Sequence, residues 1–145
     1  MSKSYDPRMH SAEHLLNQAM VRRFDCGRCF SAHINPKKSK CDYYFERALT
    51  PEEVEAVQED VNRAIQLDYP VIIEQMPREA AERAFDLARV PGKEDMTHFR
   101  VVRMGDYDAC PCIGEHVSST GEIGGFRITG AGFEDNVLRI RFKLR

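Results

Sequence analysis

Two short segments rich in histidine and cysteine could together bind a metal ion. In the first, His10-Ser11-Ala12-Glu13-His14, two imidazoles lie four residues apart and therefore on one face of a helix. The second lies about a hundred residues later and contains Cys112 and His116 with Cys-x3-His spacing in a glycine-containing loop. One thiolate and three imidazoles favour zinc over calcium or magnesium, and four such ligands complete a tetrahedral shell. The sequence predicts a zinc site at His10, His14, Cys112 and His116.

The remaining cysteines leave other assignments open. Cys26, Cys29, Cys110 and Cys112 could form a four-cysteine zinc site and leave the histidines unused, although Cys-x-Cys places two sulfurs awkwardly on one tetrahedral ion. Cys26 and Cys29 could instead be a redox pair, but they lack the βαβ context of such motifs. Cys41 is expected to be packed in the core. A zinc site of either kind could also be purely structural, tying the first helix to the C-terminal half.

Three side chains near these segments, and the backbone of a fourth residue, are candidates for helping the chemistry. Glu13, between the two histidines, could be a general base, although a glutamate in a first helical turn also favours the helix dipole. Glu115 adjoins a predicted ligand and could orient an imidazole from behind. Thr120 and Gly121 could offer a hydroxyl and backbone N–H groups to the substrate, or could simply form a tight turn.

The first motif is expected on a helix spanning about residues 10–24. Its apolar residues at helical spacing are Ala12, Leu15, Leu16 and Ala19. At 100° per residue, the two histidines point roughly 170° away from that stripe. They are therefore predicted to face solvent or a cleft.

The other elements are expected to mix helices with antiparallel strands. Thr50, Pro51 and Glu53 form a capping box that starts a helix ending before Pro70. Strict alternation predicts a strand over residues 138–144 with one buried face. The further predicted elements are strands 29–34, 41–47, 71–73, 99–104 and 126–129, a helix 77–85 and a turn region 130–136. The pattern predicts a single α+β domain, residues 1–145, as a two-layer sandwich of helices on a mainly antiparallel sheet.

Composition limits the class of protein. The chain has 145 residues, 42% hydrophobic and 30% charged, as in ordinary globular proteins. It has no apolar run of membrane length and no secretory signal, so we expect a cytoplasmic protein with reduced cysteines. A formal charge of −2 does not indicate a general nucleic-acid binder. Contact with RNA would rest on local stretches such as 37–40 and 139–145, which could equally be a solvated loop and a polar strand face.

The combination of the two motifs resembles a known family. His10-Ser11-Ala12-Glu13-His14-Leu15-Leu16 resembles the first motif of the editing domain shared by alanyl-tRNA and threonyl-tRNA synthetases and by the freestanding alanyl-tRNA editing proteins. Cys112-Ile113-Gly114-Glu115-His116-Val117 resembles the second, and the run from Ser119 to Gly124 with Phe126 continues it. The resemblance implies the synthetase second-additional-domain editing fold. It also implies His10, His14, Cys112 and His116 as metal ligands, and hydrolysis of the ester that joins a wrong amino acid to the tRNA 3′ end.

The resemblance therefore predicts a zinc-dependent deacylase of mischarged tRNA, with Ser- or Gly-tRNA-Ala as the expected substrate. The chain begins almost directly at the first motif, so we expect it to act in trans on tRNA charged elsewhere. An alternative is a zinc-stapled module that binds tRNA or a synthetase without cleaving anything. A hydrolase of small esters or amides and a purely structural zinc are further alternatives. The sequence leaves the oligomeric state and the amino acid open.

Overall fold

A computed structural model describes residues 6–88 and 90–145, which contain two antiparallel sheets and three α-helices. The helices are α1 (Pro7–Phe24), α2 (Pro51–Gln66) and α3 (Arg78–Ala84), with 3-10 turns η1 (Lys93–Asp95) and η2 (Thr120–Ile123). The strands are β1 (Ser31–His33), β2 (Ser39–Tyr44), β3 (Val71–Pro77), β4 (His98–Met104), β5 (Asp108–Pro111), β6 (Phe126–Glu134) and β7 (Val137–Leu144). The α+β class and the antiparallel pairing are confirmed.

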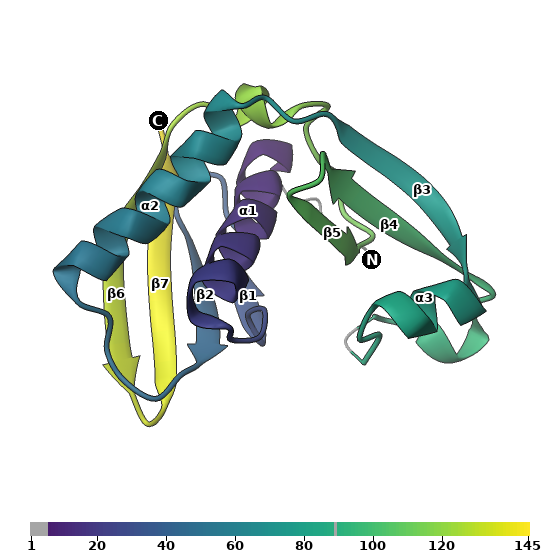
Figure 1. Ribbon diagram of the computed structural model, residues 1–145, viewed down its shortest axis with the longest axis horizontal. Helices are drawn as coiled ribbons and strands as arrows, with labels where there is room; N and C mark the ends of the chain where they lie inside the picture. The colour runs from purple at the N-terminus through teal and green to yellow at the C-terminus, as the bar shows by residue number, and fades with distance from the viewer. Residues whose placement is uncertain (1–5, 89) are drawn as a thin grey trace.

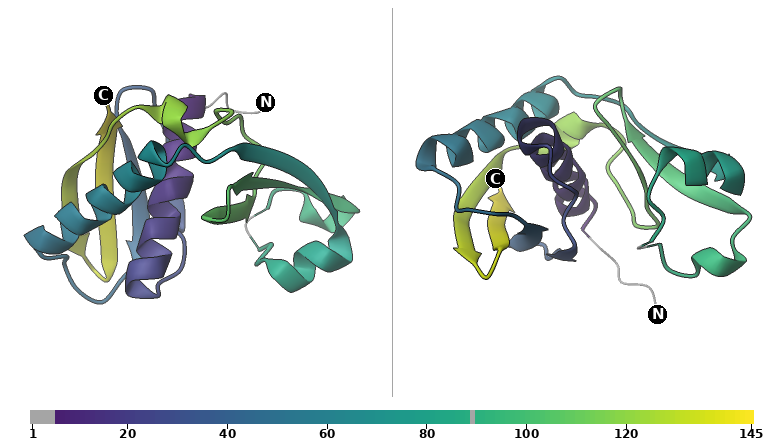
Figure 2. Two further views of the ribbon diagram at one scale, coloured as in Figure 1. Left: turned by 45° about the horizontal axis from the view of Figure 1, so that its top comes forward. Right: turned by 60° about the horizontal axis from the view of Figure 1, so that its bottom comes forward.

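The strands divide into two sheets, a division that the sequence did not predict. One has the order β1-β2-β7-β6 and the other the order β3-β4-β5. Figure 1 shows the two sheets as the arms of an arch, with α2 on the four-stranded arm and α3 on the three-stranded arm. In all three views of Figures 1 and 2, α1 lies between the two sheets. Among the described residues, no helix is long and apolar enough to cross a bilayer.

Local signals at its two ends define α1. Asp6 caps the helix, because its Oδ1 accepts a hydrogen bond of 3.0 Å from the backbone N–H of Met9, and Pro7 occupies the first turn. At the other end, Asp25 adopts a left-handed conformation with φ 52°. The helix therefore starts three residues before the predicted residue 10, because the Asp-Pro signal was not used in that prediction.

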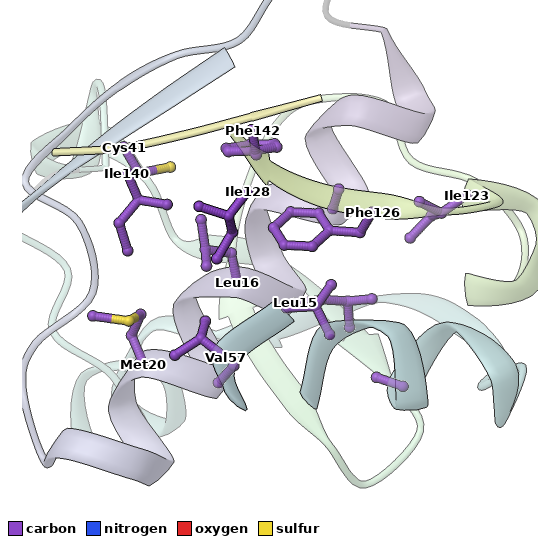
Figure 3. Packing of buried hydrophobic residues seen from close by; sticks show 14 of the residues in the cluster. Leu15, Leu16, Met20, Cys41, Val57, Ile123, Phe126, Ile128, Ile140 and Phe142 are labelled. Atoms are coloured by element: carbon purple, nitrogen blue, oxygen red, sulfur yellow. The ribbon is translucent and has the colours of Figure 1, made fainter. Parts of the chain in front are cut away.

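Both faces of α1 are covered. Leu15, Leu16 and Met20 pack toward α2 and the four-stranded sheet, where Figure 3 shows them beside sheet residues such as Ile140. The opposite face carries the two histidines, which are only 5% and 3% exposed. Of the two predicted surroundings, this burial excludes solvent, because β5 and the loop after it cover the histidine face. The helix thus presents a second, polar face to a buried partner.

The predicted capping box of α2 is confirmed. Thr50 accepts from the backbone of Glu53, and the Glu53 carboxylate accepts from the backbone of Thr50. The residues that α2 buries are Val57, Val61, Ala64 and Ile65. This face packs on β6 and η2, so α2 closes the core over the four-stranded sheet.

The C-terminal hairpin is longer than predicted. Strand β7 has the expected alternation, with Leu138, Ile140 and Phe142 fully buried. Strand β6, however, continues through the predicted turn region to Glu134, with an irregular register between Ile128 and Gly130. Its glycines were taken as turn residues, whereas the actual turn is Asp135-Asn136, both at positive φ.

Candidate metal centre

The structure brings the four predicted ligands together. One ligand atom from each of His10, His14, Cys112 and His116 lies within 4.8 Å of the other three. The Cys112 Sγ is 3.3 Å from the His10 Nε2 and 3.6 Å from the His116 Nε2. Two ligands come from α1 and two from the loop after β5. The cluster therefore forms where the histidine face of α1 meets the three-stranded arm (Figure 1).

The β-sheet fixes the start of the ligand loop. The backbone N–H of Cys112 donates to the Arg100 carbonyl at 3.0 Å, and the Arg100 guanidinium donates to the Cys112 carbonyl at 2.7 Å. Cys112 therefore stays attached to β4, one residue past the end of β5. Cys112 and His116 are half-buried, whereas the two histidines of α1 are buried. The cluster is thus accessible from the side of the loop.

Hydrogen bonds orient the rings of His10 and His116. The His10 Nδ1 lies 3.1 Å from the Glu115 carbonyl, which can only accept, so this nitrogen carries the proton and Nε2 faces Cys112. The His116 Nδ1 lies 2.9 Å from the Ser11 Oγ, and this oxygen accepts from the Val117 N–H. The His10 ring therefore directs an Nε2 lone pair into the cluster, and the hydrogen bond with Ser11 orients the His116 ring with its Nε2 toward Cys112.

A buried carboxylate stands behind His14. The Asp108 side chain is fully buried, and its Oδ2 lies 3.5 Å from the His14 Nδ1, which has no closer partner among the described residues. Asp108 also accepts from Arg28 at 2.7 Å and from Gln18 at 2.8 Å. A carboxylate behind a ligating imidazole is the usual way in which proteins orient that ring. Because Nδ1 faces Asp108, Nε2 is the nitrogen of His14 directed at Cys112.

The protonation states of the cluster favour metal binding. Burial alone would raise the pKa of Cys112, but contacts with His10, His116 and His14 outweigh it and lower this pKa to about 3. Burial lowers the pKa of His116 to about 4, which keeps that ring neutral. Burial also disfavours the charged form of His14, but Asp108 and Cys112 outweigh it and raise its pKa to about 10. A cation entering the cluster would meet a thiolate and displace the His14 proton.

The position of Asp108 behind His14 predicts that this carboxylate contributes to zinc affinity, which sequence spacing did not suggest. We expect Asp108→Asn to weaken zinc binding by about 10- to 100-fold, as is typical for loss of a carboxylate behind a ligand. The affinity can be measured by competition with a chromophoric chelator at neutral pH. Asp42→Asn is the matched control, because Asp42 is another buried carboxylate paired with an arginine, Arg139, at 2.7 Å. Equal affinities of the wild type and Asp108→Asn would contradict the role of Asp108.

The stability of the same variant should differ from that of the wild type at low pH. Arg28 and His14 overcome burial and hold the pKa of Asp108 well below its ordinary value. Its contribution to stability is therefore complete above the unfolded pKa of about 4 and is lost as the pH falls through the lower folded value. Metal-free wild-type protein should lose stability below about pH 4 more steeply than Asp108→Asn, as followed by urea unfolding.

Glu13 lies beside the cluster. Its Oε1 is 3.6 Å from the His10 Nε2, and its side chain is 14% exposed. Its Oε2 accepts from the Asn17 amide at 3.3 Å and from the Cys29 thiol at 3.5 Å. One carboxylate oxygen therefore faces the four ligands while the other faces a second group of polar side chains.

The structure places the other two predicted helpers differently. Glu115 contacts His10 through its main-chain carbonyl, and its side chain is exposed. Thr120 is fully buried, donates to the Ala64 carbonyl and accepts from the Tyr69 N–H, both at 2.8 Å. These bonds join the end of α2 to η2, so the structure does not bring the Thr120 hydroxyl to the four ligands.

The four-cysteine arrangement does not form. Cys26 donates to the Met20 carbonyl, and Cys110 donates to the Pro111 carbonyl. Cys29 instead lies beside Cys41 and Glu13. The hydrogen bond with Cys41 lowers the pKa of Cys29, and the same contact together with burial raises that of Cys41. Cys41 is thus packed as expected, but next to another thiol.

Sequence reasoning missed the residues that hold the ligands in place. Asp108, Ser11 and Arg28 reach the cluster only through the fold, and no spacing rule marks them. The one available signal was an acidic residue just before a cysteine-containing segment that was read as a loop. Strand β5, which holds Asp108, was not predicted at all.

Comparison with known proteins identifies similar sequences. Residues 99–141 match the family model described as the threonyl and alanyl tRNA synthetase second additional domain. An alanine–tRNA ligase of Coxiella burnetii is 38% identical over 123 residues, covering 83% of this chain and 14% of the ligase. One from Methanothrix thermoacetophila is 35% identical over 144 residues, covering 93% of this chain and 15% of the ligase.

The matched length is a small part of these relatives. A third alanine–tRNA ligase, from Leptospira borgpetersenii, is 36% identical over 120 residues, which are 82% of this chain and 13% of the ligase. The chain therefore spans about one seventh of the curated relatives that it matches. The similarity concerns one domain-sized region of much longer enzymes.

Proposed function

We propose that this chain, whose residues 99–141 match the threonyl and alanyl tRNA synthetase second additional domain, hydrolyses the ester bond of mischarged aminoacyl-tRNA. The observation that supports this most is the convergence of three imidazoles and one thiolate within 4.8 Å. This donor set is suited to zinc, and each imidazole has a polar group behind it, as expected of metal ligands: the Glu115 carbonyl, the Ser11 hydroxyl and the Asp108 carboxylate. His10, His14, Cys112 and His116 are the ligands in this proposal.

In this proposal the bound ion stabilises charge and a protein side chain transfers the proton. A zinc ion held there would supply positive charge next to the ester and so stabilise the negative charge that develops on its carbonyl oxygen. Four protein ligands fill a tetrahedral shell, so the proton of the attacking water goes to a side chain. The substrate reaches the cluster from the side of Cys112 and His116, the two half-buried ligands.

Glu13 is the proposed general base. Its Oε1 lies beside His10 on the cluster side, whereas Asn17 and Cys29 hold its Oε2 and fix the carboxylate plane. Water adds to the ester carbonyl carbon as Glu13 takes its proton. The bond to the ribose oxygen then breaks, and that oxygen takes the proton back from Glu13.

We propose serine or glycine on tRNA-Ala as the substrate, with the chain acting in trans in the cytoplasm. The alanine–tRNA ligases similar to this chain support the choice of tRNA. Exposed basic side chains that could contact RNA phosphates are Lys37, Lys38, Arg141 and Lys143. Thr120 is assigned to the positioning of η2 rather than to the reaction.

A deacylation assay tests the proposal. The purified chain, with zinc and without any synthetase, is mixed with tRNA-Ala charged with radiolabelled serine, glycine or alanine. We expect release of serine or glycine well above the spontaneous rate, with alanine released more slowly. Uncharged tRNA should compete if the RNA is part of what is recognised. Spontaneous rates for all three amino acids would refute the hydrolase.

A second function has one observation in its favour. Four protein ligands without an open position are typical of structural zinc sites. The alternative is therefore a zinc-stapled module that binds charged tRNA without cleaving it. It predicts that charged tRNA binds the chain and is recovered intact, a result that the same assay detects when binding is measured in parallel.

A further inference from the structure

A second group of ligand-type atoms lies next to the first. Glu13, Cys29 and Cys41 each place one ligand atom within 4.8 Å of the other two. They come from α1, from the segment before β1 and from β2, so the fold rather than local sequence assembles them. The two cysteines are 2% and 0% exposed. Figure 3 shows Cys41 at the edge of the apolar core, on the sheet that α1 covers.

Glu13 is a largely buried carboxylate without a cationic partner of its own. Its described contacts are the His10 ring, the Asn17 amide and the Cys29 thiol, and no described lysine or arginine forms an ion pair with it. A buried carboxylate is costly unless a cation or several strong donors compensate it. A divalent ion beside Oε2 would supply that compensation.

The carbonyl oxygen of the neighbouring Asn17 side chain is already hydrogen-bonded to other groups. The Asn17 Oδ1 accepts from the backbone N–H of Cys29 at 3.0 Å and from the Tyr43 hydroxyl at 2.8 Å. These bonds fix Cys29 and Asn17 in the wall of the group, and the two thiols contact each other and Glu13, as ligands of one ion would. The group therefore consists of two sulfurs and one carboxylate oxygen, and the hydrogen bonds of Asn17 hold it in position.

We propose that Glu13, Cys29 and Cys41 form a second metal site, which takes a thiophilic divalent ion such as zinc. On binding, the two thiols become thiolates and release two protons to solvent, while the carboxylate ligates through Oε2. Three protein ligands leave one position of a tetrahedral shell for solvent. Glu13 bridges the two sites, because its Oε1 faces the first cluster.

The charges of the two sites are complementary. Zinc with three neutral imidazoles and one thiolate carries a net charge of +1, whereas zinc with two thiolates and one carboxylate carries −1. Adjacent buried charges of opposite sign favour each other. The second site shares Glu13 with the hydrolytic activity proposed above, so its tests change only the two cysteines.

Metal stoichiometry tests the second site. The chain is purified under reducing conditions, exchanged into zinc and analysed for metal by mass spectrometry. We expect about two ions per chain in the wild type and about one in Cys29→Ser and in Cys41→Ser. Cys26→Ser is the matched control, because Cys26 is a partly buried thiol outside this group that donates to the Met20 carbonyl, and it should keep two.

A measurement on the wild type covers the case in which the variants do not fold. Cadmium titrated into reduced, metal-free protein should produce an ultraviolet sulfur-to-cadmium band that saturates with the intensity of three thiolates at two equivalents. A band of one thiolate at one equivalent would overturn the second site. Recovery of a Cys29–Cys41 disulfide from reduced, zinc-loaded protein would overturn it too. A chain with one ion and full deacylase activity would refute the second site while leaving the hydrolase intact.

Discussion

Cys112→Ala is expected to lower deacylation of mischarged tRNA by roughly 10³-fold and to remove the ion from the first cluster. The side chain supplies the only thiolate of this cluster, and it contacts the rings of His10 and His116 at 3.3 Å and 3.6 Å. Stabilisation of a developing oxyanion by a metal amounts to several kcal/mol, and about 1.4 kcal/mol corresponds to a factor of ten in rate. Single-turnover deacylation and metal analysis measure the two effects.

Cys110→Ala is the control for that variant. Cys110 lies two residues away and is also half-buried, but its thiol donates to the Pro111 carbonyl and is not one of the four clustered groups. It should keep both the metal and the activity. A Cys112→Ala protein that is folded, metal-free and fully active would exclude any metal-dependent mechanism at this cluster.

Glu13→Gln is expected to lower the single-turnover rate of deacylation by about 10²-fold while the first cluster keeps its ion. General-base catalysis contributes about 10²- to 10⁴-fold, and glutamine preserves the shape of the side chain but cannot take a proton. The effect should fall on the rate at saturating enzyme, because Glu13 does not contact the remote parts of the substrate in this proposal.

Glu115→Gln separates this effect from a general change in charge. The Glu115 side chain is exposed, and its contact with His10 is made by the backbone, so the variant should behave as wild type. Metal analysis of Glu13→Gln must still find at least one ion per chain. Unchanged deacylation by this variant would assign the proton transfer to another group.

The four side chains of the cluster could be predicted from the sequence because each pair is encoded locally. His10 and His14 share a helix face by spacing alone, and Cys112 and His116 share one short loop. The contact between the two pairs is long-range in sequence, and it was predicted from the resemblance to a family and not from spacing. The capping box at Thr50 and the alternation in β7 were predictable for the same local reason.

Features that depend on tertiary contacts were not predictable. The periodicity of α1 defines one apolar face, but the burial of its polar face requires knowing that β5 packs against it. Asp108 would be read as a surface residue until Arg28 and Gln18 are placed around it. The glycines of β6 favour a turn locally, and only pairing with β7 makes them a strand.

The position of α1 between the two arms of the arch has a thermodynamic consequence. His10 and His14 lie on α1, which packs on α2 and the four-stranded sheet, whereas Cys112 is hydrogen-bonded to β4 of the other arm. An ion in the cluster would therefore connect the two sheets. The affinity of the cluster for the ion would then depend on the angle between the sheets. Any partner that spread the two arms would weaken ion binding, and ion binding would oppose the spreading by the same free energy.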